Sequence, residues 1–373
     1  MEYNLTEKQQ EGLNICLERY KNKKPYTIIA GYAGTGKSYL VNAIVDNFGF
    51  KEEEVAYACY TGKAALVLQK QGKNAVTLHK LLYNTHQGEN GTFIHEPKEF
   101  LDRDFKLIVV DEISMCPANL WKLLLKHKVY TIGLGDPFQL PPIGDNVNLL
   151  DSPHIFLTEI MRQALDNDII KYSMFLRQGQ KLPSGIRGKN IQTYKKDELK
   201  TGMILWADQI LCAKNSTRKD LNLQARQIFG KKGLLDEGDK LICTKNYWEN
   251  LTREKETILV NGVIGTAKKI TIERKKIISD LILENGECFE GLLLDRSFLE
   301  KGIPTPPYKR NGKVLRNFYK EVDYGYAITV HKAQGSQFDK VLVYDDCWLQ
   351  GEEYRRWLYT AITRAVDKVV ILL

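Results

Sequence analysis

YTIIAGYAGTGKS, residues 26–38, joins an apolar run to a loop rich in glycine. The loop fits the phosphate-binding pattern G-x-x-x-x-G-K-[ST], whose fixed positions are Gly31, Gly36, Lys37 and Ser38. In such a loop backbone N–H groups surround the phosphates at a helix N-terminus, the lysine reaches the β and γ oxygens, and the hydroxyl holds magnesium. The apolar run predicts a strand before the loop and a helix from Ser38. The stretch therefore predicts an α/β domain that binds a nucleotide.

The pattern around this loop repeats along the chain. VAYACY, LIVVD and VYTIGLG are short β-rich runs, and helical segments begin at Gly62 and Pro117. The alternation resumes after Leu150 with the runs IFLT, QILCA, YAITV, KVLVYD and KVVILL, separated by helical segments and by one long insertion. Such alternation is typical of parallel sheets with helices on both faces, so we expect two α/β domains.

Two segments interrupt the alternation. Residues 83–104 hold polar turn residues around a short TFI run, which predicts a small β-hairpin. Residues 235–321 are rich in strands and turns, which predicts a small β-barrel inserted into the second domain. We therefore expect a first domain at 1–150 and a second domain formed by 151–234 and 322–373, with the barrel between its two parts.

The composition is that of an ordinary globular protein, with 43% hydrophobic and 27% charged residues among 373. The net charge of +8 indicates a polyanionic partner or simply a basic surface. The nearest two of the seven cysteines, Cys212 and Cys243, are 31 positions apart, which excludes a C-x-x-C motif and favours reduced thiols in a cytosol. The N-terminus resembles neither a signal nor a transit peptide, and no apolar run approaches the ~20 residues that span a bilayer. We expect a cytoplasmic protein without a membrane partner.

LIVVDEISM, residues 107–115, places Asp111 and Glu112 at the end of an apolar strand. Ligands of α/β sheets bind beyond the carboxyl ends of the strands. One carboxylate there can complete a magnesium shell while the next orients or deprotonates the attacking water. An acidic pair alone is more often a loop start or a helix cap, and the phosphate-binding loop in the same domain is what favours the catalytic interpretation.

GLGDPFQLPP, residues 133–142, ends another apolar run in a turn rich in proline. Taken alone, its glycine, aspartate and prolines indicate only a turn. If Asp136 ends a strand next to Asp111, Gln139 lies beside the γ-phosphate as a long neutral side chain that both donates and accepts. The prolines limit the displacement of that side chain. We therefore expect Gln139 to respond to the γ-phosphate.

With these motifs the chain resembles the superfamily 1 helicases, and within them the superfamily 1B group that includes RecD and the phage Dda helicases. The resemblance spans almost the whole length and includes, in the order of the family, LTEKQ (5–9), TGKAA (61–65), TLHKLL (77–82), LTEIMRQ (157–163), TVHKAQGSQFD (329–339) and LYTAITRA (358–365). It implies an α/β fold with two RecA-like P-loop domains, parallel sheets, a small hairpin insertion and a small barrel insertion. It also implies ATP and Mg²⁺ as cofactors.

The resemblance assigns roles to single residues. Gln9 is the expected adenine contact, Gln139 the sensor of the γ-phosphate, and Arg162 and Arg364 the arginines supplied by the second domain. Arginines from a second domain suit phosphoryl transfer here, because the P-loop domain offers no obvious arginine near its strand ends. The catalytic set is Lys37, Asp111, Glu112, Gln139, Arg162 and Arg364, and the metal ligands are Ser38 and Asp111. The nucleotide contacts are Gln9, Gly31, Ala33, Gly34, Thr35, Gly36, Lys37, Ser38, Tyr39, Arg162, Gly335 and Arg364.

Contacts to DNA are expected at Thr61, Lys63, His79, Thr329 and His331, which are small donors or cations suited to a phosphate backbone. Without the family pattern, a structural role is the more common alternative for the histidines. Phe93 lies where Dda-like proteins carry the aromatic residue of a strand-separating pin. The alternative role for Phe93 is to anchor the hairpin. YKRNGKVLRNFYK, residues 308–320, interleaves cations with aromatic residues as single-strand binders do, or forms a solvated hairpin.

The sequence thus predicts an ATP- and magnesium-dependent DNA helicase that moves 5′ to 3′ on single-stranded DNA, a polarity implied by the resemblance alone. Single-stranded DNA and duplex junctions are the expected partners, with a replication or single-strand-binding protein as a further candidate, and a monomer is expected. An RNA-directed or non-unwinding translocase stays open, because backbone contacts carry little base information. A small-molecule kinase would not explain the second domain, and an inactive ATPase would not be expected to keep Lys37, Glu112 and Arg364.

Overall fold

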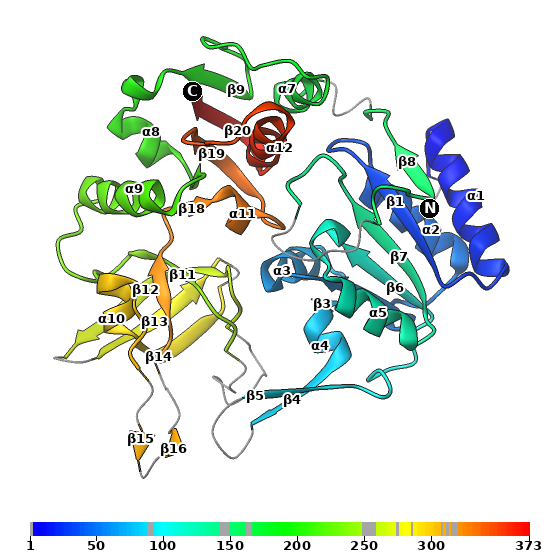
Figure 1. Cartoon of the computed structure of the whole chain (residues 1–373), viewed down its shortest axis with the longest axis horizontal. Helices are drawn as coiled ribbons and strands as arrows, with labels where there is room; N and C mark the ends of the chain where they lie inside the picture. Colours follow the sequence, from blue (N-terminus) through cyan, green and yellow to red (C-terminus); the bar gives the residue numbers. More distant parts are fainter. Residues whose placement is uncertain are drawn as a thin grey trace.

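The computed structural model describes residues 3–87, 93–141, 149–161, 166–247, 259–273, 276–284, 286–306, 309–310, 313–314 and 319–373. These residues form two parallel sheets, an antiparallel sheet and two short two-stranded pairs. The N-terminal parallel sheet lies on one side of Figure 1, and the other parallel sheet and the antiparallel sheet lie on the opposite side. The predicted α/β class with parallel sheets is confirmed.

The first parallel sheet has the strand order β3-β2-β6-β7-β1-β8. Its strands are β1 (Tyr26–Gly31), β2 (Val55–Cys59), β3 (Ala75–Thr77), β6 (Leu107–Asp111), β7 (Tyr130–Gly135) and β8 (Ile155–Leu157). Every residue of β2 and β7 is buried. This burial explains why these runs are continuously apolar, because helices cover both faces of a parallel sheet.

Helices pack on both faces of this first sheet. On one face α1 (Glu7–Lys21) and α2 (Lys37–Phe48) form a core that includes Leu40 and Ile44. On the other face α4 (Leu78–Leu82) and α5 (Ala118–Lys126) form a core that includes Leu78 and Trp121. Successive strand residues such as Ile28 and Ile29 point into opposite cores, as the period of a strand requires. The helix α3 (Gly62–Lys70) faces the other half of the molecule in Figure 1.

The strand β8 pairs in parallel with β1, with Ile155 opposite Ile29 and Leu157 opposite Gly31. The sequence alone places the IFLT run in the second domain. In the structure the strand that it forms, β8, completes the first sheet. The cause is the open outer edge of β1, whose hydrogen-bonding groups take β8 as partner. The first sheet therefore extends past the boundary predicted at residue 150.

The second parallel sheet has the strand order β18-β10-β19-β20-β9. Its strands are β9 (Ile191–Tyr194), β10 (Gln209–Cys212), β18 (Ala327–Thr329), β19 (Phe338–Tyr344) and β20 (Ala365–Leu372). The helices of this half are α7 (Asp168–Arg177), α8 (Thr201–Trp206), α9 (Asn215–Ile228), α11 (Val330–Ala333) and α12 (Gly351–Ile362). The side chains of α7 and α12 bury Leu176, Trp357 and Tyr359 against the sheet. The helices alternate with the strands along the chain, as the sequence predicts for an α/β domain.

Along the chain, the antiparallel sheet is inserted between the two parts of this second half. Its strand order is β14-β13-β12-β11-β17. Its strands are β11 (Lys240–Cys243), β12 (Ile264–Ile272), β13 (Ile277–Leu283), β14 (Cys288–Leu294) and β17 (Val322–Tyr324), and the helix α10 (Arg296–Lys301) follows β14. A bridge between Leu294 and Lys320 joins the two ends of the sheet, so the strands curl toward a closed barrel. The strand β17 lies beyond the predicted end of the insertion at residue 321.

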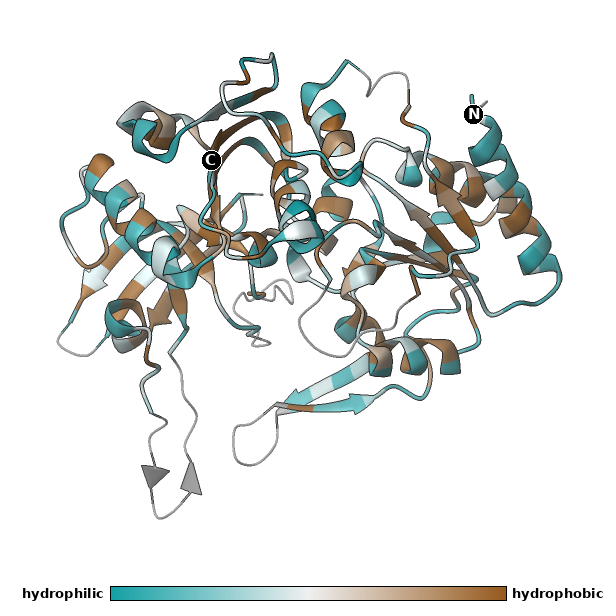
Figure 2. Ribbon diagram, turned by 45° about the horizontal axis from the view of Figure 1, so that its top comes forward, coloured by the Kyte–Doolittle hydropathy of each residue, from teal (hydrophilic) through white to brown (hydrophobic). Residues whose placement is uncertain are grey.

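Two hairpins project from these sheets. β4 (Tyr83–Gln87) pairs antiparallel with β5 (Phe93–Pro97) inside the segment 83–104, where a hairpin is expected. Figure 2 shows this hairpin as mostly hydrophilic beside the hydrophobic strands of the first sheet. β15 (Lys309–Arg310) pairs with β16 (Lys313–Val314). In the described part of the chain, no helix combines the length and apolar character needed to cross a membrane.

Candidate nucleotide cleft and nucleic-acid groove

The phosphate-binding loop follows β1 and leads into α2, as the motif requires. Gly34 and Gly36 have left-handed φ values of 78° and 76°, which favour glycine. A Cβ on Gly36 would lie 2.3 Å from Met161 Sδ and 2.5 Å from Gln9 Nε2. The Lys37 ammonium donates to the carbonyl of Gly31 at 2.6 Å and to that of Tyr32 at 3.1 Å. The loop and its lysine are therefore held in a fixed shape.

The carboxylate pair lies at the carboxyl end of β6. Asp111 is the last residue of the strand, and the Glu112 backbone N–H donates to Asp111 Oδ1 at 2.9 Å. Glu112 has a left-handed backbone with φ of 52°, an uncommon conformation for glutamate that is found at functional sites. Burial raises the pKa of both carboxyls, and the nearby charges of Arg364 and Lys37 oppose that rise.

Gln139 lies between the two halves of the molecule. With its amide oriented to satisfy both neighbours, it donates to Glu112 Oε2 at 3.3 Å and accepts from Arg364 Nη2 at 3.1 Å. Arg364 Nη1 lies 3.7 Å from Glu112 Oε1, and Arg364 Nε donates to the carbonyl of Thr360 at 3.1 Å. The predicted glutamine of the first half and arginine of the second half thus meet at the predicted carboxylate.

These residues surround a cleft of ≈ 610 Å³. Its lining includes most of the predicted nucleotide and catalytic residues, namely Ala33, Gly34, Gly36, Lys37, Ser38, Tyr39, Asp111, Glu112, Gln139, Gly335 and Arg364. The motifs of the two parallel sheets therefore face one shared cavity. The cleft is also lined by Asp136, Met161 and Asn167, which the sequence analysis does not assign to the nucleotide site.

Three of the predicted nucleotide residues that the structure describes, Gln9, Gly31 and Thr35, are not part of the cleft lining. Gln9 is 1% exposed, and its amide is used inside the protein, accepting from Thr6 N at 3.1 Å and donating to Thr35 O at 3.2 Å. Gly31 and Thr35 belong to the loop but not to the cleft lining, and Thr35 Oγ1 donates to Tyr32 O at 2.8 Å. Arg162 lies outside the described residues. Gln9 thus supports the loop from behind, and its contact with adenine stays a prediction.

A divalent metal fits the residues at this cleft. Ser38 and Asp111 both line it, and they supply hydroxyl and carboxylate oxygens of the kind that magnesium prefers. Within the described ranges, no group of three or more histidine, cysteine, aspartate or glutamate side chains could hold a metal by itself. A metal at Ser38 and Asp111 would therefore complete its shell with phosphate oxygens and water, as magnesium commonly does.

A second cavity, of ≈ 250 Å³, gathers four of the expected nucleic-acid contacts: Thr61, Lys63, His79 and His331. We call it the groove. Asn246 and Asn261, next to the antiparallel sheet, also line it. A Cβ on Gly62 would lie 2.2 Å from Val260 Cγ2, so the start of α3 packs directly against the inserted unit. Segments from the first domain, from α11 with the turn that follows it, and from the inserted unit thus all line the groove.

The threonines expected to contact DNA have a structural role in the fold. Thr61 Oγ1 accepts from Ala64 N at 3.2 Å and caps α3, while Thr329 Oγ1 accepts from Lys332 N at 3.3 Å and caps α11. Thr77, which the sequence analysis does not single out, caps α4 in the same way. Thr329 does not line the groove, so the structure separates it from the other four expected contacts.

The cations of the groove are desolvated. The Lys63 ammonium has no hydrogen-bond partner among the described residues and lies 4.2 Å from the centre of the Phe338 ring. Burial lowers its pKa to about 8, and burial also lowers the pKa of His79 and of His331. The lowered pKa favours the neutral form of both histidines, which still donates through one ring N–H, so their expected contact with a phosphate backbone stays a prediction. The rings of Tyr60 and Tyr83 both lie beside His79, with centres 6.1 and 5.9 Å from that of the imidazole.

Phe93 begins β5 and pairs with Gln87 across the hairpin. Its side chain lies outside what the structure describes, so its role as a pin stays a prediction. The same holds for the aromatic residues Tyr308 and Phe318 of the basic stretch.

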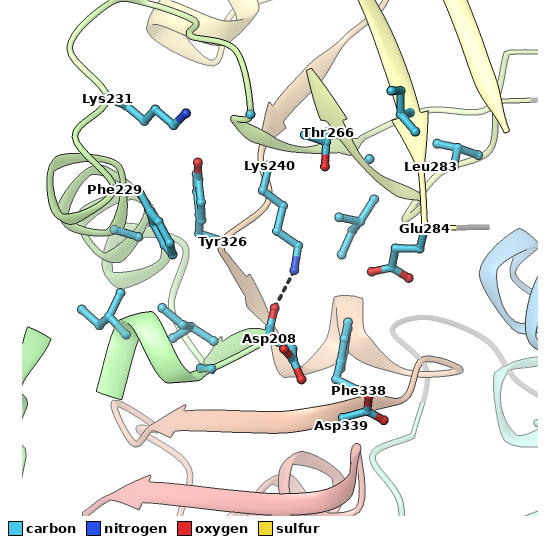
Figure 3. A pocket seen from close by; sticks show the side chains of 18 of the residues that line it. Asp208, Phe229, Lys231, Lys240, Thr266, Leu283, Glu284, Tyr326, Phe338 and Asp339 are labelled. Carbon is cyan, nitrogen blue, oxygen red and sulfur yellow. Dashed lines mark hydrogen bonds between the residues drawn. The ribbon is translucent and has the colours of Figure 1, made fainter. Parts of the chain in front are cut away.

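A further cavity of ≈ 640 Å³ lies between the second sheet and the antiparallel sheet (Figure 3). Lys240 of β11 crosses it and donates to the Asp208 carbonyl at 2.5 Å, which ties the inserted unit to the second sheet. Phe229 and Tyr326 stack at one end, with ring centres 5.3 Å apart. Carboxylates and ammonium groups both line this cavity, so it offers no surface of one charge to a polyanion.

A P-loop, a carboxylate pair and an arginine from a second parallel sheet define a class of enzyme, the P-loop nucleotide hydrolases whose site lies between two domains. Comparisons with known proteins identify the family. A family model described as an AAA domain matches residues 4–199, and one described as a UvrD-like helicase C-terminal domain matches residues 324–372. The chain belongs to the superfamily 1B helicases, a family of ATP-hydrolysing enzymes.

Several curated relatives are ATP-dependent DNA helicases. The ATP-dependent RecD2 DNA helicase of Deinococcus radiodurans is 29% identical over 91% of this chain, which spans only 46% of that relative. The ATP-dependent DNA helicase dda of Enterobacteria phage T4 is 25% identical over 96% of this chain and 97% of its own length. The Pif1 helicase of Campylobacter jejuni is 24% identical over 91% of this chain and 86% of its own length.

Solved structures agree on the fold. The Pif1 helicase of Bacteroides, in complex with ADP-AlF3 and single-stranded DNA, gives a TM-score of 0.57 at 17% identity and covers 99% of this chain and 92% of its own. The Pif1 helicase of Candida albicans gives a TM-score of 0.55 at 19% identity, covering 100% and 94%. The two parallel sheets are therefore the two predicted RecA-like domains.

Proposed function

We propose that the chain is an ATP- and magnesium-dependent DNA helicase that moves 5′ to 3′ on single-stranded DNA and separates duplex DNA. The observation that carries the proposal is the meeting of Glu112, Gln139 and Arg364 at a P-loop cleft. These three groups come from both RecA-like domains. Hydrolysis therefore depends on how the two domains are arranged, which is the property a motor needs.

The residues of the cleft divide the chemistry of hydrolysis. The loop from Gly31 to Ser38 binds the phosphates, and Lys37 offsets the charge on their β and γ oxygens. Ser38 and Asp111 would hold magnesium, which would supply positive charge to offset the charge that develops on the phosphates. Glu112 accepts a proton from the attacking water, and burial moves its pKa upward, toward the operating pH where a general base is most effective. Arg364 stabilises the transition state, and Arg162 is its proposed companion.

The cleft and the groove share structural elements, which supports coupling between them. The helix α3 contributes Ala64 and Val67 to the cleft but Thr61 and Lys63 to the groove. A change in the position of α3 on nucleotide binding would therefore be felt at both cavities.

The turn after α11, in the second domain, also lines both the cleft and the groove. Gly335 and Gln337 line the cleft, while Gln334 and Ser336, which alternate with them, line the groove. A Cβ on Gly335 would lie 3.0 Å from Thr61 Oγ1, so this turn and α3 are packed together. Domain movement cannot change one cavity without changing the other.

The remaining parts of the proposal rest on the family. Direction of movement and the wedge at Phe93 come from the resemblance to Dda-like proteins. The resemblance also suggests DNA contacts at Thr329, a monomer that acts in the cytosol, and a replication or single-strand-binding protein as partner. We also propose the three units indicated by the sequence, with β8 added to the first RecA-like domain and β17 to the barrel.

Strand displacement tests this function. Duplexes with a 5′ tail, a 3′ tail or no tail are made in DNA and in RNA, and release of the labelled strand is followed with ATP and magnesium. We expect release only from the 5′-tailed DNA. Release from the 3′-tailed DNA alone would contradict the proposed polarity. Preferential release from the RNA duplexes would contradict DNA as the substrate. ATP hydrolysis without strand release would mean that the protein does not unwind duplexes, as expected of a translocase.

A further inference from the structure

Tyr359 crosses from one RecA-like domain to the other. It lies on α12 and is fully buried. Its hydroxyl accepts from the backbone N–H of Ala33 in the phosphate-binding loop at 2.9 Å and donates to Asp136 Oδ2 at 2.5 Å. Burial and the neighbouring carboxylate raise the pKa of this phenol well above its usual value, so it keeps its proton and donates. One hydroxyl thus joins two separate segments of the first domain to the second domain.

Asp136 passes this contact on to Gln139. The carboxylate is 2% exposed, and its second oxygen accepts from Phe138 N at 2.9 Å. The backbone N–H of Gln139 donates to the Asp136 carbonyl at 3.3 Å. Asp136 therefore shapes the turn that presents the Gln139 amide to Glu112 and Arg364.

The second domain holds the rest of this turn as well. Leu140 N donates to Thr360 Oγ1 at 2.9 Å, and Leu140 O accepts from Gln334 Nε2 at 2.7 Å. The Phe138 ring meets the Tyr359 ring edge to face, with centres 5.2 Å apart. Residues 136–140 belong by sequence to the first domain, but Leu140 is buried in the core of the second. The turn can keep this shape only while the two domains are docked.

We propose that Tyr359 is a positioning residue that links the phosphate-binding loop to Gln139 and holds the two RecA-like domains in the arrangement that hydrolyses ATP. When the domains separate, Ala33 N–H and Asp136 lose their partner and must be solvated instead. Tyr359 does not touch the reacting atoms. It acts by favouring the docked arrangement, and it deepens the proposed motor function, on which it rests.

A buried tyrosine can also be only a part of the core, and the chain offers a matched control for that role. Tyr354 lies on the same helix and donates to Asp345 Oδ2 at 2.6 Å. Both ends of that bond belong to the second domain. Tyr354→Phe therefore removes the same kind of hydrogen bond without breaking a contact between domains.

The test compares Tyr359→Phe, Tyr354→Phe and the unchanged protein. Thermal melting shows that each is folded, affinity for ADP reports binding at the loop, and kcat and KM for ATP are measured with and without single-stranded DNA. A hydrogen bond to a charged group affects equilibria by roughly tenfold or more. We expect Tyr359→Phe to lower kcat at least about tenfold with ADP affinity kept within about twofold, and Tyr354→Phe to change kcat by less than about twofold.

Equal kcat values for the two phenylalanine variants would overturn the proposal, and so would a loss of ADP affinity equal to the loss of kcat. If Tyr359→Phe does not fold, Asp136→Asn serves instead, because Tyr359 and Phe138 donate to different oxygens of Asp136 and the amide replaces one of these acceptors with an NH2 donor. It must then lower kcat more than Tyr354→Phe does, or the proposal fails. Absence of stimulation by DNA in the unchanged protein would count against the motor function, whereas the DNA-free kcat values still decide the role of Tyr359.

Discussion

The nucleotide cleft and the groove differ in how their charged groups are satisfied. In the cleft, Lys37 donates to two loop carbonyls, and Arg364 meets both Gln139 and Glu112. In the groove, the Lys63 ammonium is buried over an aromatic ring and makes no hydrogen bond in the part of the chain that the structure describes. The cleft is preorganised by contacts within the protein. The groove instead holds a desolvated cation that gains a partner when an anion binds.

This difference determines how strongly a substitution in each cavity should affect activity or affinity. Removing a residue from the preorganised cleft destroys an arrangement that several others depend on, so losses should be large and concentrated in turnover. Removing a residue from the groove removes one contact among several to a phosphate backbone, so losses should be smaller and concentrated in affinity. Four variants test this ranking.

The largest effect is expected for Lys37→Ala. The ammonium is the cation at the β and γ oxygens, and a lost electrostatic contact of this kind lowers the rate by roughly 10²- to 10³-fold or more. Steady-state ATP hydrolysis with single-stranded DNA measures it. Lys8→Ala is the control, since Lys8 makes only an exposed ion pair with Glu11. Hydrolysis by Lys37→Ala at the rate of the control would refute the assignment of the cleft.

Gln139→Ala should come next. Its amide joins Glu112 to Arg364, and without it these two residues lose the hydrogen-bonded link between them. We expect nucleotide binding to be retained and stimulation of ATP hydrolysis by DNA to fall by about 10- to 100-fold. Gln10→Ala, on the exposed side of α1, is the control. Unchanged stimulation would mean that the glutamine is not part of the coupling.

Lys63→Met should lower affinity for a single-stranded oligonucleotide by about tenfold and leave DNA-free ATP hydrolysis intact. A bound phosphate raises the pKa of Lys63 from about 8, so binding takes up a proton above that pH. Affinity should therefore fall as pH rises from 7.5 to 9.5 in the unchanged protein, more steeply than in the variant. Binding followed by fluorescence anisotropy measures both effects.

Lys70→Met is the matched control for this experiment, because Lys70 is exposed on the same helix. The same pKa gives a stability prediction. The folded state holds fewer protons than the unfolded chain between about 8 and 10.5, so the free energy of unfolding should rise with pH over that window. An identical pH dependence of DNA affinity in Lys63→Met and the unchanged protein would contradict the role of the buried ammonium.

The smallest effect is expected for Phe93→Ala. If Phe93 is a wedge, the variant should unwind a tailed duplex several-fold more slowly while its DNA-stimulated ATP hydrolysis is unchanged, because stacking on a base contributes about 1–3 kcal/mol. Phe100→Ala is the control, as Phe100 is 78% exposed just beyond the hairpin. Parallel loss of both activities would favour an anchoring role for Phe93.

The sequence predicts the local parts of this molecule well. Lys37, Asp111, Glu112 and Gln139 lie in short motifs at strand ends, and parallel strands bring their carboxyl ends to one edge whatever the details of packing. The continuous apolar runs of β2, β6 and β7 likewise follow from burial on both faces. These features need no information from distant parts of the chain.

What the sequence does not predict depends on long-range contacts. Tyr359 is 326 positions from Ala33 and 223 from Asp136, and no local pattern pairs them. Pairing of β8 with β1 depends on which sheet edge is open, which a short run cannot indicate. The lowered pKa of His79 and of His331 comes from burial in the groove, which is lined by segments far apart in the sequence. The available signal for Tyr359 is its position inside the motif at 358–365, five residues before Arg364.

The central claim is that the cleft and the groove are coupled through the docking of the two RecA-like domains. Because such coupling is reciprocal, the most direct measurement is the affinity of the unchanged protein for a single-stranded DNA oligonucleotide, with and without a saturating non-hydrolysable ATP analogue and magnesium. We expect the analogue to change this affinity by about fivefold or more, and we expect Gln139→Ala to abolish that change. Equal affinities in the unchanged protein with and without the analogue would contradict the central claim.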